Sequence, residues 1–325
     1  MKRIVLSHPL YEDGMALLAK QTDVEVRIAN SGERDKQLAL LRDADAFILR
    51  IGRVDADMML ECPELKVITR PGVGVDTIDV DCATARGIPV VVTPGANSRS
   101  VAEHAMTLLF ALAKDLTHSQ SEAKAGNYGV RNEYAAFELE GKTLGVLGFG
   151  NIGRIVASMA AALDMRVLVY DPFVAEGIPE RMGYARAVTL EQALSGSDAV
   201  TLHMLSNEQT RGMIGERELS QMREGALLVN CARGDLVRED ALYEALRSGH
   251  LAGAAEDMMV AEPFDVSSPL LTLPNFVATP HMAALTRESA ARSAVMAVEG
   301  TLAVLRGERW LHVFCKDVYA HERWK

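Results

Sequence analysis

Three side chains that can carry chemistry each come shortly after a short apolar run. Arg233 offers a guanidinium that can bind a carboxylate or a keto oxygen, His281 offers an imidazole that can exchange a proton near neutral pH, and Glu262 offers a carboxylate. Parallel strands are buried on both faces and therefore appear as continuous apolar runs. If the runs are strands of one parallel sheet, the three side chains meet at its carboxyl edge, where ligands bind in open α/β sheets. The runs are residues 226–230, 253–257 and 276–279.

Each of these residues also has a structural interpretation. Arg233 could pair with Asp235 or face solvent, and a single histidine such as His281 is more often structural than catalytic. An arginine, an acid and a histidine after three successive strands are less easily explained in this way, because all three would converge on one end of a bound ligand. The pattern as a whole favours catalysis.

A glycine-rich turn earlier in the chain predicts a phosphate-binding loop. Gly148, Gly150 and Gly153 follow an apolar run and open a helical run. In this pattern the first glycine permits a tight turn, the second lets the backbone approach a pyrophosphate, and the third lets the helix pack closely on its strand. The N–H groups at the start of the helix, which include those of Asn151 and Ile152, would face the anion.

The next apolar run predicts which dinucleotide is bound. Asp171 follows residues 165–170, close to the spacing of about 20 residues at which an acid contacts the adenosine ribose. The same carboxylate would repel the 2′-phosphate of NADP, and residues 172–174 contain no arginine that could relieve the repulsion. The sequence therefore predicts NAD as the cofactor, with Arg233 and His281 at its nicotinamide end.

Composition limits the classes of protein that the chain can be. Its 325 residues suffice for two domains, and 49% apolar and 24% charged residues are typical of a globular protein. A net charge of −10 disfavours binding to nucleic acid or to an anionic membrane. No stretch approaches the roughly 18 apolar residues of a membrane span, and the N-terminal apolar run is too short for a signal peptide. The four cysteines lie far apart, so we expect no metal site, no disulfides and a location in the reducing cytoplasm.

Apolar runs alternate with helical patterns along most of the chain, which predicts two doubly wound parallel sheets and the α/β class. Residues 1–99 form the first of these units. A long apolar helix follows, with Ser100 as its predicted N-cap and Glu103 completing a capping box. Residues 117–133 are predicted to be an exposed connection. The last helical run, 289–305, could close the second unit or return to the first.

Seven motifs resemble those of the D-isomer-specific 2-hydroxyacid dehydrogenase family, which includes D-lactate, glycerate, hydroxypyruvate and D-3-phosphoglycerate dehydrogenases. The resemblance implies an NAD-dependent oxidoreductase in which a Rossmann NAD-binding domain, residues 100–285, is inserted in a flavodoxin-like substrate domain, residues 1–99 and 286–325. It also implies a homodimer, and we expect no regulatory extension of the kind that many phosphoglycerate dehydrogenases carry. The motifs are residues 72–79, 94–98, 101–104, 147–153, 230–234, 262–263 and 279–281.

The resemblance assigns roles to these residues. His281 would be the acid/base catalyst, protonating the keto oxygen during reduction and accepting the hydroxyl proton during oxidation, and Glu262 would hydrogen-bond and orient its imidazole. Arg233 would bind the carboxylate and keto oxygen of a 2-keto acid. The same carboxylate would be held by backbone N–H groups of the first domain, at Val73, Gly74 and Val75. Further cofactor contacts are implied for His203, Cys231, Ala232 and Asp257.

Several features leave the substrate and the activity open. Arg50 and Arg53 lie where relatives face the substrate, so they could bind a second anionic group or be exposed arginines at a helix start. Asp257 could also be a strand-end acid that faces solvent, and the aromatic segment 310–325 could cover the substrate site or a partner subunit. Noncatalytic NAD(H)-sensing corepressors share this fold, so a sensor is the alternative function. The presence of all three catalytic side chains favours the enzyme.

Overall fold

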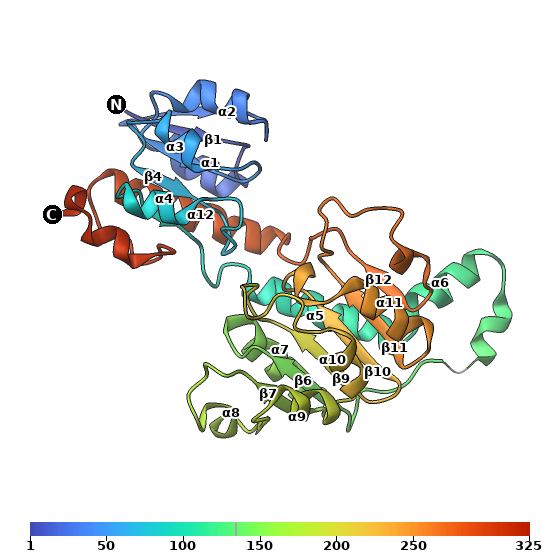
Figure 1. Cartoon of the computed structure of the whole chain (residues 1–325). Helices are drawn as coiled ribbons and strands as arrows, with labels where there is room; N and C mark the ends of the chain where they lie inside the picture. The colour runs from blue at the N-terminus through green and yellow to red at the C-terminus, as the bar shows by residue number, and fades with distance from the viewer. Residues whose placement is uncertain (134) are drawn as a thin grey trace. The chain divides into compact units, whose positions relative to one another are not determined.

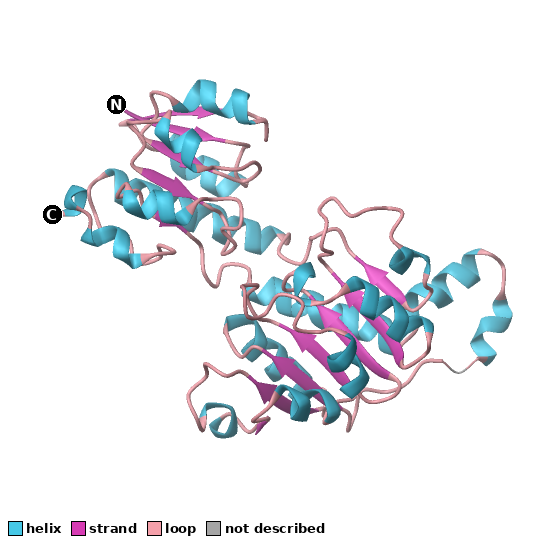
Figure 2. Ribbon diagram, viewed as in Figure 1, coloured by secondary structure: helices cyan, strands magenta, loops and turns pink. Residues whose placement is uncertain are grey.

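The chain divides into two compact units (Figure 1). The computed structural model describes residues 1–133 and 135–325. Unit 1 comprises Met1–Asn97 and Leu285–Lys325, and unit 2 comprises Ser98–Ala284. Each unit is built on one sheet of parallel strands with helices on both faces (Figure 2). The predicted fold class, two doubly wound α/β domains, is confirmed.

Unit 1 contains a five-stranded sheet in the order β2-β1-β3-β4-β5, which is the flavodoxin-like order. Successive residues of its strands point to opposite faces, so each strand serves two cores. Phe47 and Ile68 lie in the core on one face, and Ile4 and Ile48 lie in the core on the other. The strands are β1 (Lys2–Leu6), β2 (Val24–Ile28), β3 (Ala46–Ile48), β4 (Val67–Thr69) and β5 (Val90–Val91). The helices are α1 (Glu12–Ala19), α2 (Arg34–Leu41), α3 (Ala56–Leu60), α4 (Val80–Ala85) and α12 (Arg287–Leu305), followed by the 3₁₀ helices η4 (Lys316–Ala320) and η5 (Glu322–Trp324).

The aromatic C-terminal segment packs on the core of unit 1. Trp310, Tyr319 and Trp324 lie against the same apolar cluster as Val313, which is buried. The indole N–H of Trp324 donates to the carbonyl oxygen of Gly87 at 2.9 Å. This packing gives the aromatic residues a structural role within unit 1 that the sequence did not predict.

Unit 2 contains a seven-stranded sheet in the order β12-β11-β10-β9-β6-β7-β8. The strand order reverses between β6 and β9, which is the point where dinucleotides bind in doubly wound sheets. The inner strands are buried along their whole length because helices cover both faces. The strands are β6 (Thr143–Leu147), β7 (Arg166–Tyr170), β8 (Ala185–Arg186), β9 (Ala199–Leu202), β10 (Ala226–Asn230), β11 (Leu251–Glu256) and β12 (Phe276–Ala278). The helices are α5 (Ser98–Ala113), α6 (Leu116–Lys124), α7 (Asn151–Ala161), α8 (Ile178–Arg181), α9 (Leu190–Ser195), α10 (Glu216–Gln221) and α11 (Glu239–Arg247), with the 3₁₀ helices η1 (Tyr128–Asn132), η2 (Gly234–Leu236) and η3 (Pro269–Thr272).

One local prediction in unit 2 is wrong and another is incomplete. Because α5 begins at Ser98, Ser100 lies inside the helix, where its hydroxyl donates to the carbonyl oxygen of Ala283 at 2.5 Å instead of capping. Glu103 pairs with Arg99 at 2.5 Å and completes no capping box. The predicted connection 117–133 is exposed, as expected, but it contains most of α6 and the whole of η1. No residue of α6 is buried, so its sequence lacks the apolar stripe by which a surface helix is recognised.

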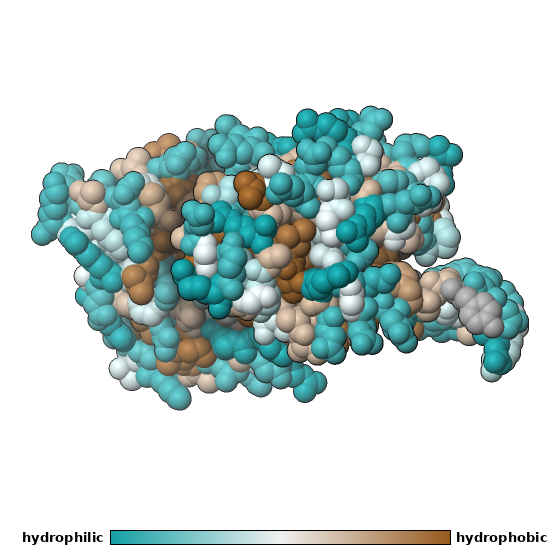
Figure 3. Space-filling model, turned by 90° about the horizontal axis from the view of Figure 1, so that it is seen from below, coloured by the Kyte–Doolittle hydropathy of each residue, from teal (hydrophilic) through white to brown (hydrophobic). Residues whose placement is uncertain are grey.

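The face of the molecule shown in Figure 3 is mostly hydrophilic, and its apolar side chains lie in separate patches. Large apolar side chains that are more than half exposed include Leu116, Tyr128 and Val266. Among the helices of the described residues, none is long and apolar enough to cross a membrane.

Candidate active site

Three neighbouring strands bring the predicted chemical residues to one edge of the sheet of unit 2. β10, β11 and β12 are adjacent, and Asn230 pairs with Glu256, which pairs with Ala278, at their carboxyl ends. The loops that follow these strands carry Arg233, Glu262 and His281, in that order. The predicted convergence on one sheet edge therefore follows from the strand order.

His281 and Glu262 are in contact at this edge. Nδ1 of the imidazole lies 3.0 Å from Oε1 and 3.1 Å from Oε2 of the carboxylate. The two side chains are 47% and 39% exposed, so a ligand can reach the imidazole. A carboxylate at Nδ1 holds the proton on that nitrogen and leaves Nε2 for proton exchange with a bound molecule. The backbone of His281 is left-handed, with φ of 49°, and its N–H donates to the carbonyl oxygen of Asp257 at 2.7 Å.

Arg233 leaves β10 in a loop that the side chain of Asn230 holds. Nδ2 of Asn230 donates to the carbonyl oxygen of Arg233 at 2.9 Å, and the N–H of Ala232 donates to Oδ1 of Asn230 at 3.0 Å. The guanidinium donates to the carbonyl oxygen of Ala232 at 2.7 Å. Asp235, the partner considered in the structural interpretation of Arg233, pairs instead with Arg211 at 3.1 Å.

Asp257 anchors the loop that carries His281. Its carboxylate is 1% exposed and accepts from the hydroxyl of Thr279 at 2.5 Å and from the N–H groups of Met282 and Ala283, both at 2.9 Å. Nε2 of His104, on α5, lies 3.4 Å from this carboxylate. Burial opposes ionisation, but the hydrogen bonds from His104, Thr279 and the backbone hold the pKa of Asp257 below its ordinary value. Asp257 is therefore a buried anion, and the alternative prediction, a strand-end acid that faces solvent, is wrong.

The start of α7 presents open backbone donors. Gly148 has φ of 96°, and Gly150 occupies the N-cap position, where no side chain caps the helix. The first helical residues are Asn151, Ile152 and Gly153, whose N–H groups have no acceptor one turn earlier in the helix. A Cβ at Gly153 would overlap the carbonyl oxygen of Gly148, so only glycine allows this approach of helix and turn. These residues fit the pyrophosphate of a dinucleotide.

Asp171, at the end of β7, is tied to the same glycine loop. Its Oδ2 accepts from the N–H of Phe149 at 2.7 Å. Its Oδ1 accepts from the N–H groups of Phe173 and Val174 at 2.8 and 3.2 Å. Each carboxylate oxygen has two lone pairs, so Oδ2 can still accept from one ribose hydroxyl. The carboxylate thus places a negative charge beside the phosphate-binding turn.

The other predicted cofactor contacts lie at the carboxyl ends of β9 and β10. Burial lowers the pKa of His203 to about 3, so its imidazole is neutral, and Nε2 lies 3.0 Å from the hydroxyl of Thr201. Cys231 and Ala232 are buried. Burial also raises the pKa of the Cys231 thiol far above its ordinary value, which makes this cysteine an inert packing group.

In unit 1, residues 72–79 form a loop with free backbone donors. Within the part of the chain that the structure describes, the N–H groups of residues 73–75 donate to no protein acceptor. Arg50 is exposed, and its guanidinium donates to the carbonyl oxygen of Pro9, while Arg53 is exposed as well. The loop can receive an anion through its backbone, whereas Arg50 already has one protein partner.

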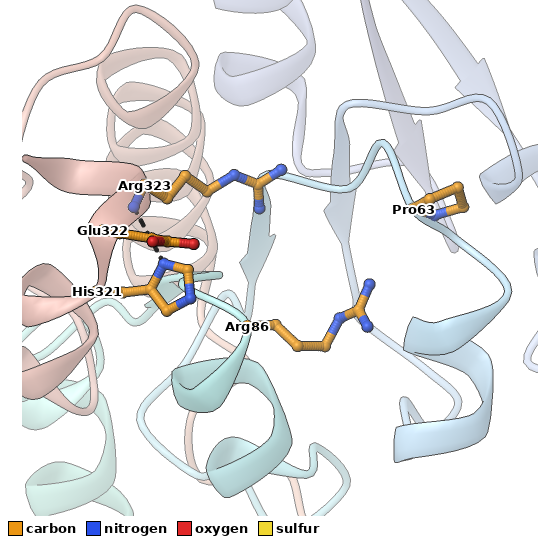
Figure 4. A pocket seen from close by; sticks show the side chains of 5 residues that line it. All are labelled: Pro63, Arg86, His321, Glu322 and Arg323. Atoms are coloured by element: carbon orange, nitrogen blue, oxygen red, sulfur yellow. Dashed lines mark hydrogen bonds between the residues drawn. The ribbon is translucent and has the colours of Figure 1, made fainter.

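A surface pocket of about 600 Å³ lies in unit 1 (Figure 4). It is lined by Pro63, Arg86, His321, Glu322 and Arg323. The last three come from the C-terminal segment. None of the predicted catalytic or cofactor residues lines this pocket, so the sheet edge of unit 2 remains the candidate site.

Four polar side chains that hold the site received no role from the sequence. Asn230 and Glu256 each end an otherwise apolar strand, and this is a signal that could have found them. Thr279 and His104 meet across 175 residues of sequence, with Nε2 of the histidine 2.9 Å from the hydroxyl. That contact has no local sequence signal.

Comparison with known proteins agrees with this arrangement. Residues 106–283 match the family described as D-isomer specific 2-hydroxyacid dehydrogenase, NAD binding domain. The chain is 40% identical over 309 residues to a D-3-phosphoglycerate dehydrogenase of Methanocaldococcus jannaschii, a match that covers 95% of this chain and 58% of that protein. The chain thus spans little more than half the length of that relative.

Two further proteins match over nearly their whole length. A hydroxypyruvate reductase of Thermotoga maritima is 36% identical over 300 residues, which cover 91% of this chain and 96% of that protein. The crystal structure of the TT0316 protein from Thermus thermophilus has a TM-score of 0.88 and 34% identity, covering 96% of this chain and 100% of that chain. The resemblance predicted from the sequence motifs is confirmed: the protein belongs to the D-isomer specific 2-hydroxyacid dehydrogenase family.

Proposed function

We propose that this protein is an NAD-dependent D-2-hydroxyacid dehydrogenase that transfers a hydride between NAD(H) and C2 of a small 2-hydroxy or 2-keto acid. The contact between His281 and Glu262 carries the proposal, because it provides an oriented imidazole at the carboxyl edge of a dinucleotide-binding sheet. Arg233 lies at the same edge, on the loop after β10, which is two strands from β12 and the loop of His281. The family membership supports this chemistry.

NADH, when bound, supplies the hydride that reduces C2 of the keto acid. In this direction His281, protonated, gives the proton on Nε2 to the keto oxygen as negative charge develops there. Glu262 stays at Nδ1, where its negative charge stabilises the imidazolium and fixes the plane of the ring. In the reverse direction neutral His281 accepts the hydroxyl proton. The net reaction consumes one hydride and one proton, and it yields a 2-hydroxy acid.

Substrate binding is assigned to backbone and guanidinium donors. The guanidinium of Arg233 would bind the carboxylate and the keto oxygen, where it also stabilises the negative charge that develops on that oxygen. The free N–H groups of residues 73–75 would bind the same carboxylate. Arg50 is the candidate for a second anionic group on the substrate. On this basis unit 1 is the substrate domain and unit 2 the NAD-binding domain.

A substrate screen tests the proposed function. NADH is mixed with the protein and, separately, with hydroxypyruvate, glyoxylate, pyruvate, phosphohydroxypyruvate or sulfopyruvate. We expect at least one 2-keto acid to drive oxidation of NADH with formation of one equivalent of a D-2-hydroxy acid. NADPH serves as the matched control and should react more slowly. Binding of NADH without turnover of any 2-keto acid would instead support the sensor.

Replacement of Asp171 should alter cofactor selection. Asp171→Asn keeps a hydrogen-bond acceptor but removes the charge that repels a 2′-phosphate, so we expect KM for NADPH to fall about tenfold and KM for NADH to rise less than that. Glu176→Gln, an exposed acid on the same loop, is the matched control. Steady-state kinetics with both cofactors check this. An unchanged ratio of the two KM values would show that Asp171 does not discriminate between NADH and NADPH.

We also propose that the protein is a cytoplasmic homodimer that binds neither membrane nor nucleic acid. All four cysteines are free in the structure, which suits a reducing compartment. No residue of α6 is buried, and Leu116 at its start is 57% exposed, so this helix offers an uncovered surface to a second copy. Light scattering coupled to size-exclusion chromatography measures the oligomeric state, and a monomeric mass would exclude the dimer.

A further inference from the structure

A second acid, with no role in the proposed chemistry, lies beneath the loops of the candidate active site. Glu256 is the last residue of β11, between β10 and β12, and is 0% exposed. It pairs in register with Asn230 of β10 and with Ala278 of β12. It therefore occupies the layer of the sheet from which the loops of Arg233 and His281 both depart.

Within residues 1–133 and 135–325, the carboxyl group of Glu256 has one polar partner. Nδ2 of Asn230 donates to Oε1 of Glu256 at 3.2 Å, while Oε2 is buried and has no partner among the described residues. Asn230 is itself 0% exposed. Its other hydrogen bonds go to the backbone of Ala232 and Arg233. The side chain of Asn230 thus joins Glu256 directly to the loop.

The partners of Asn230 require one orientation of its amide. Oδ1 must face the N–H of Ala232, and Nδ2 must face the carbonyl oxygen of Arg233. An acceptor at position 256 stabilises this orientation and disfavours the flipped amide, because the flipped amide would bring its oxygen against the carboxyl oxygen. An apolar side chain at this position would leave one of the two buried N–H bonds of the Asn230 amide without an acceptor.

We propose that Glu256 is a positioning residue that acts through Asn230 to fix the path of the backbone at Ala232 and Arg233, and thereby the place from which the Arg233 guanidinium binds substrate. The role rests on the function proposed above for Arg233.

The protonation state of Glu256 indicates which amino acid can replace it without loss of the positioning role. Burial raises the pKa of Glu256 to about 8, and the negative charge of Glu239 on α11 acts in the same direction, whereas the hydrogen bond from Asn230 lowers it. The group is therefore mostly a neutral acid at pH 7. Glutamine has nearly the same shape and the same carbonyl acceptor, so Glu256→Gln should keep the hydrogen bond, and Glu256→Leu should remove it.

Kinetics of the 325-residue chain separate positioning from general stability. For Glu256→Leu we expect KM for the 2-keto acid to rise about tenfold and KM for NADH to rise clearly less. Arg233 contacts the substrate directly, whereas Cys231 and Ala232 on the same loop are only two of several proposed cofactor contacts. Glu256→Gln should restore KM for the 2-keto acid. The double variant of Asn230→Ala and Glu256→Leu should be no worse than Asn230→Ala alone. Equal effects of Leu and Gln, or a parallel rise in both KM values, would overturn the proposal.

Hydrogen exchange provides a readout that does not depend on turnover. In Glu256→Leu the amides of peptides covering residues 230–234 should exchange about tenfold faster than in wild type, whereas those of β6 and α7 should be unchanged. Glu256→Gln should exchange like wild type. If no 2-keto acid is reduced by wild type but this pattern appears, the positioning role stands and the proposed function fails. Unchanged exchange in the leucine variant would overturn the positioning role itself.

Discussion

His281→Ala should reduce the rate of NADH oxidation by a 2-keto acid about a thousandfold, with little change in the affinity for NADH. General acid catalysis by a positioned side chain typically contributes about 10²- to 10⁴-fold. Alanine at position 281 removes the imidazole that Glu262 orients, and with it the proton donor. The affinity for NADH should persist because the glycine turn and Asp171 are untouched. Steady-state rates from NADH absorbance and NADH titrations by fluorescence measure the two quantities.

A second histidine of unit 2 provides the control for this variant. His250 precedes β11, at the amino edge of the sheet, and its Nε2 lies 2.9 Å from the carbonyl oxygen of Leu219. His250→Ala should keep most of the wild-type rate. If His281→Ala retained more than a tenth of the activity, proton transfer would have to come from another group and the assigned role of His281 would be wrong.

Arg233→Ala should lower kcat/KM for the 2-keto acid about 10²- to 10³-fold. Hydrogen bonds to a charged group contribute about 1.5–3 kcal/mol, and a guanidinium can make two of them to one carboxylate. Arg233→Lys keeps the charge but loses the planar, bidentate geometry, so we expect it to recover only part of the loss. Steady-state kinetics at saturating NADH give this ratio for each variant.

The control for Arg233 lies on the same stretch of chain. Arg238 is 59% exposed and pairs with Asp240 at 2.8 Å, so Arg238→Ala removes one positive charge near the loop without altering the site. It should change kcat/KM less than twofold. If Arg238→Ala lowered kcat/KM as much as Arg233→Ala does, the effect would come from the positive electrostatic potential of the region. Arg233 would then make no specific contact with the substrate.

The sheet of unit 2 could be predicted well because its strands are buried on both faces. The run 226–230 is β10 as the structure has it, since a strand covered on both sides is apolar at nearly every position. Once the strands are correct, their loops and the residues on them follow. This is why Arg233, Glu262 and His281 could be named before the fold was known.

What could not be predicted depends on contacts between distant segments. Nothing near Ser100 in the sequence indicates that its hydroxyl is taken by the carbonyl oxygen of Ala283, so a local capping pattern gave the wrong result. The anchoring of the His281 loop by Asp257 and His104 likewise joins residues that are far apart in the chain. Short-range patterns identify elements, whereas the side chains that hold a site are found only when the elements are packed together.

The split of unit 1 into two chain segments has a consequence for how the protein folds as it is synthesised. Every residue of unit 2 has been made once Ala284 has been added, whereas α1 still lacks its neighbour α12. The two helices fit closely, since a Cβ at Gly14 would lie 2.7 Å from that of Ala294. Because domains generally fold as units during synthesis, the unit that begins the chain is the later one to be completed. Until then, the apolar surface that α12 covers on β3, β4 and β5 lacks its partner helix.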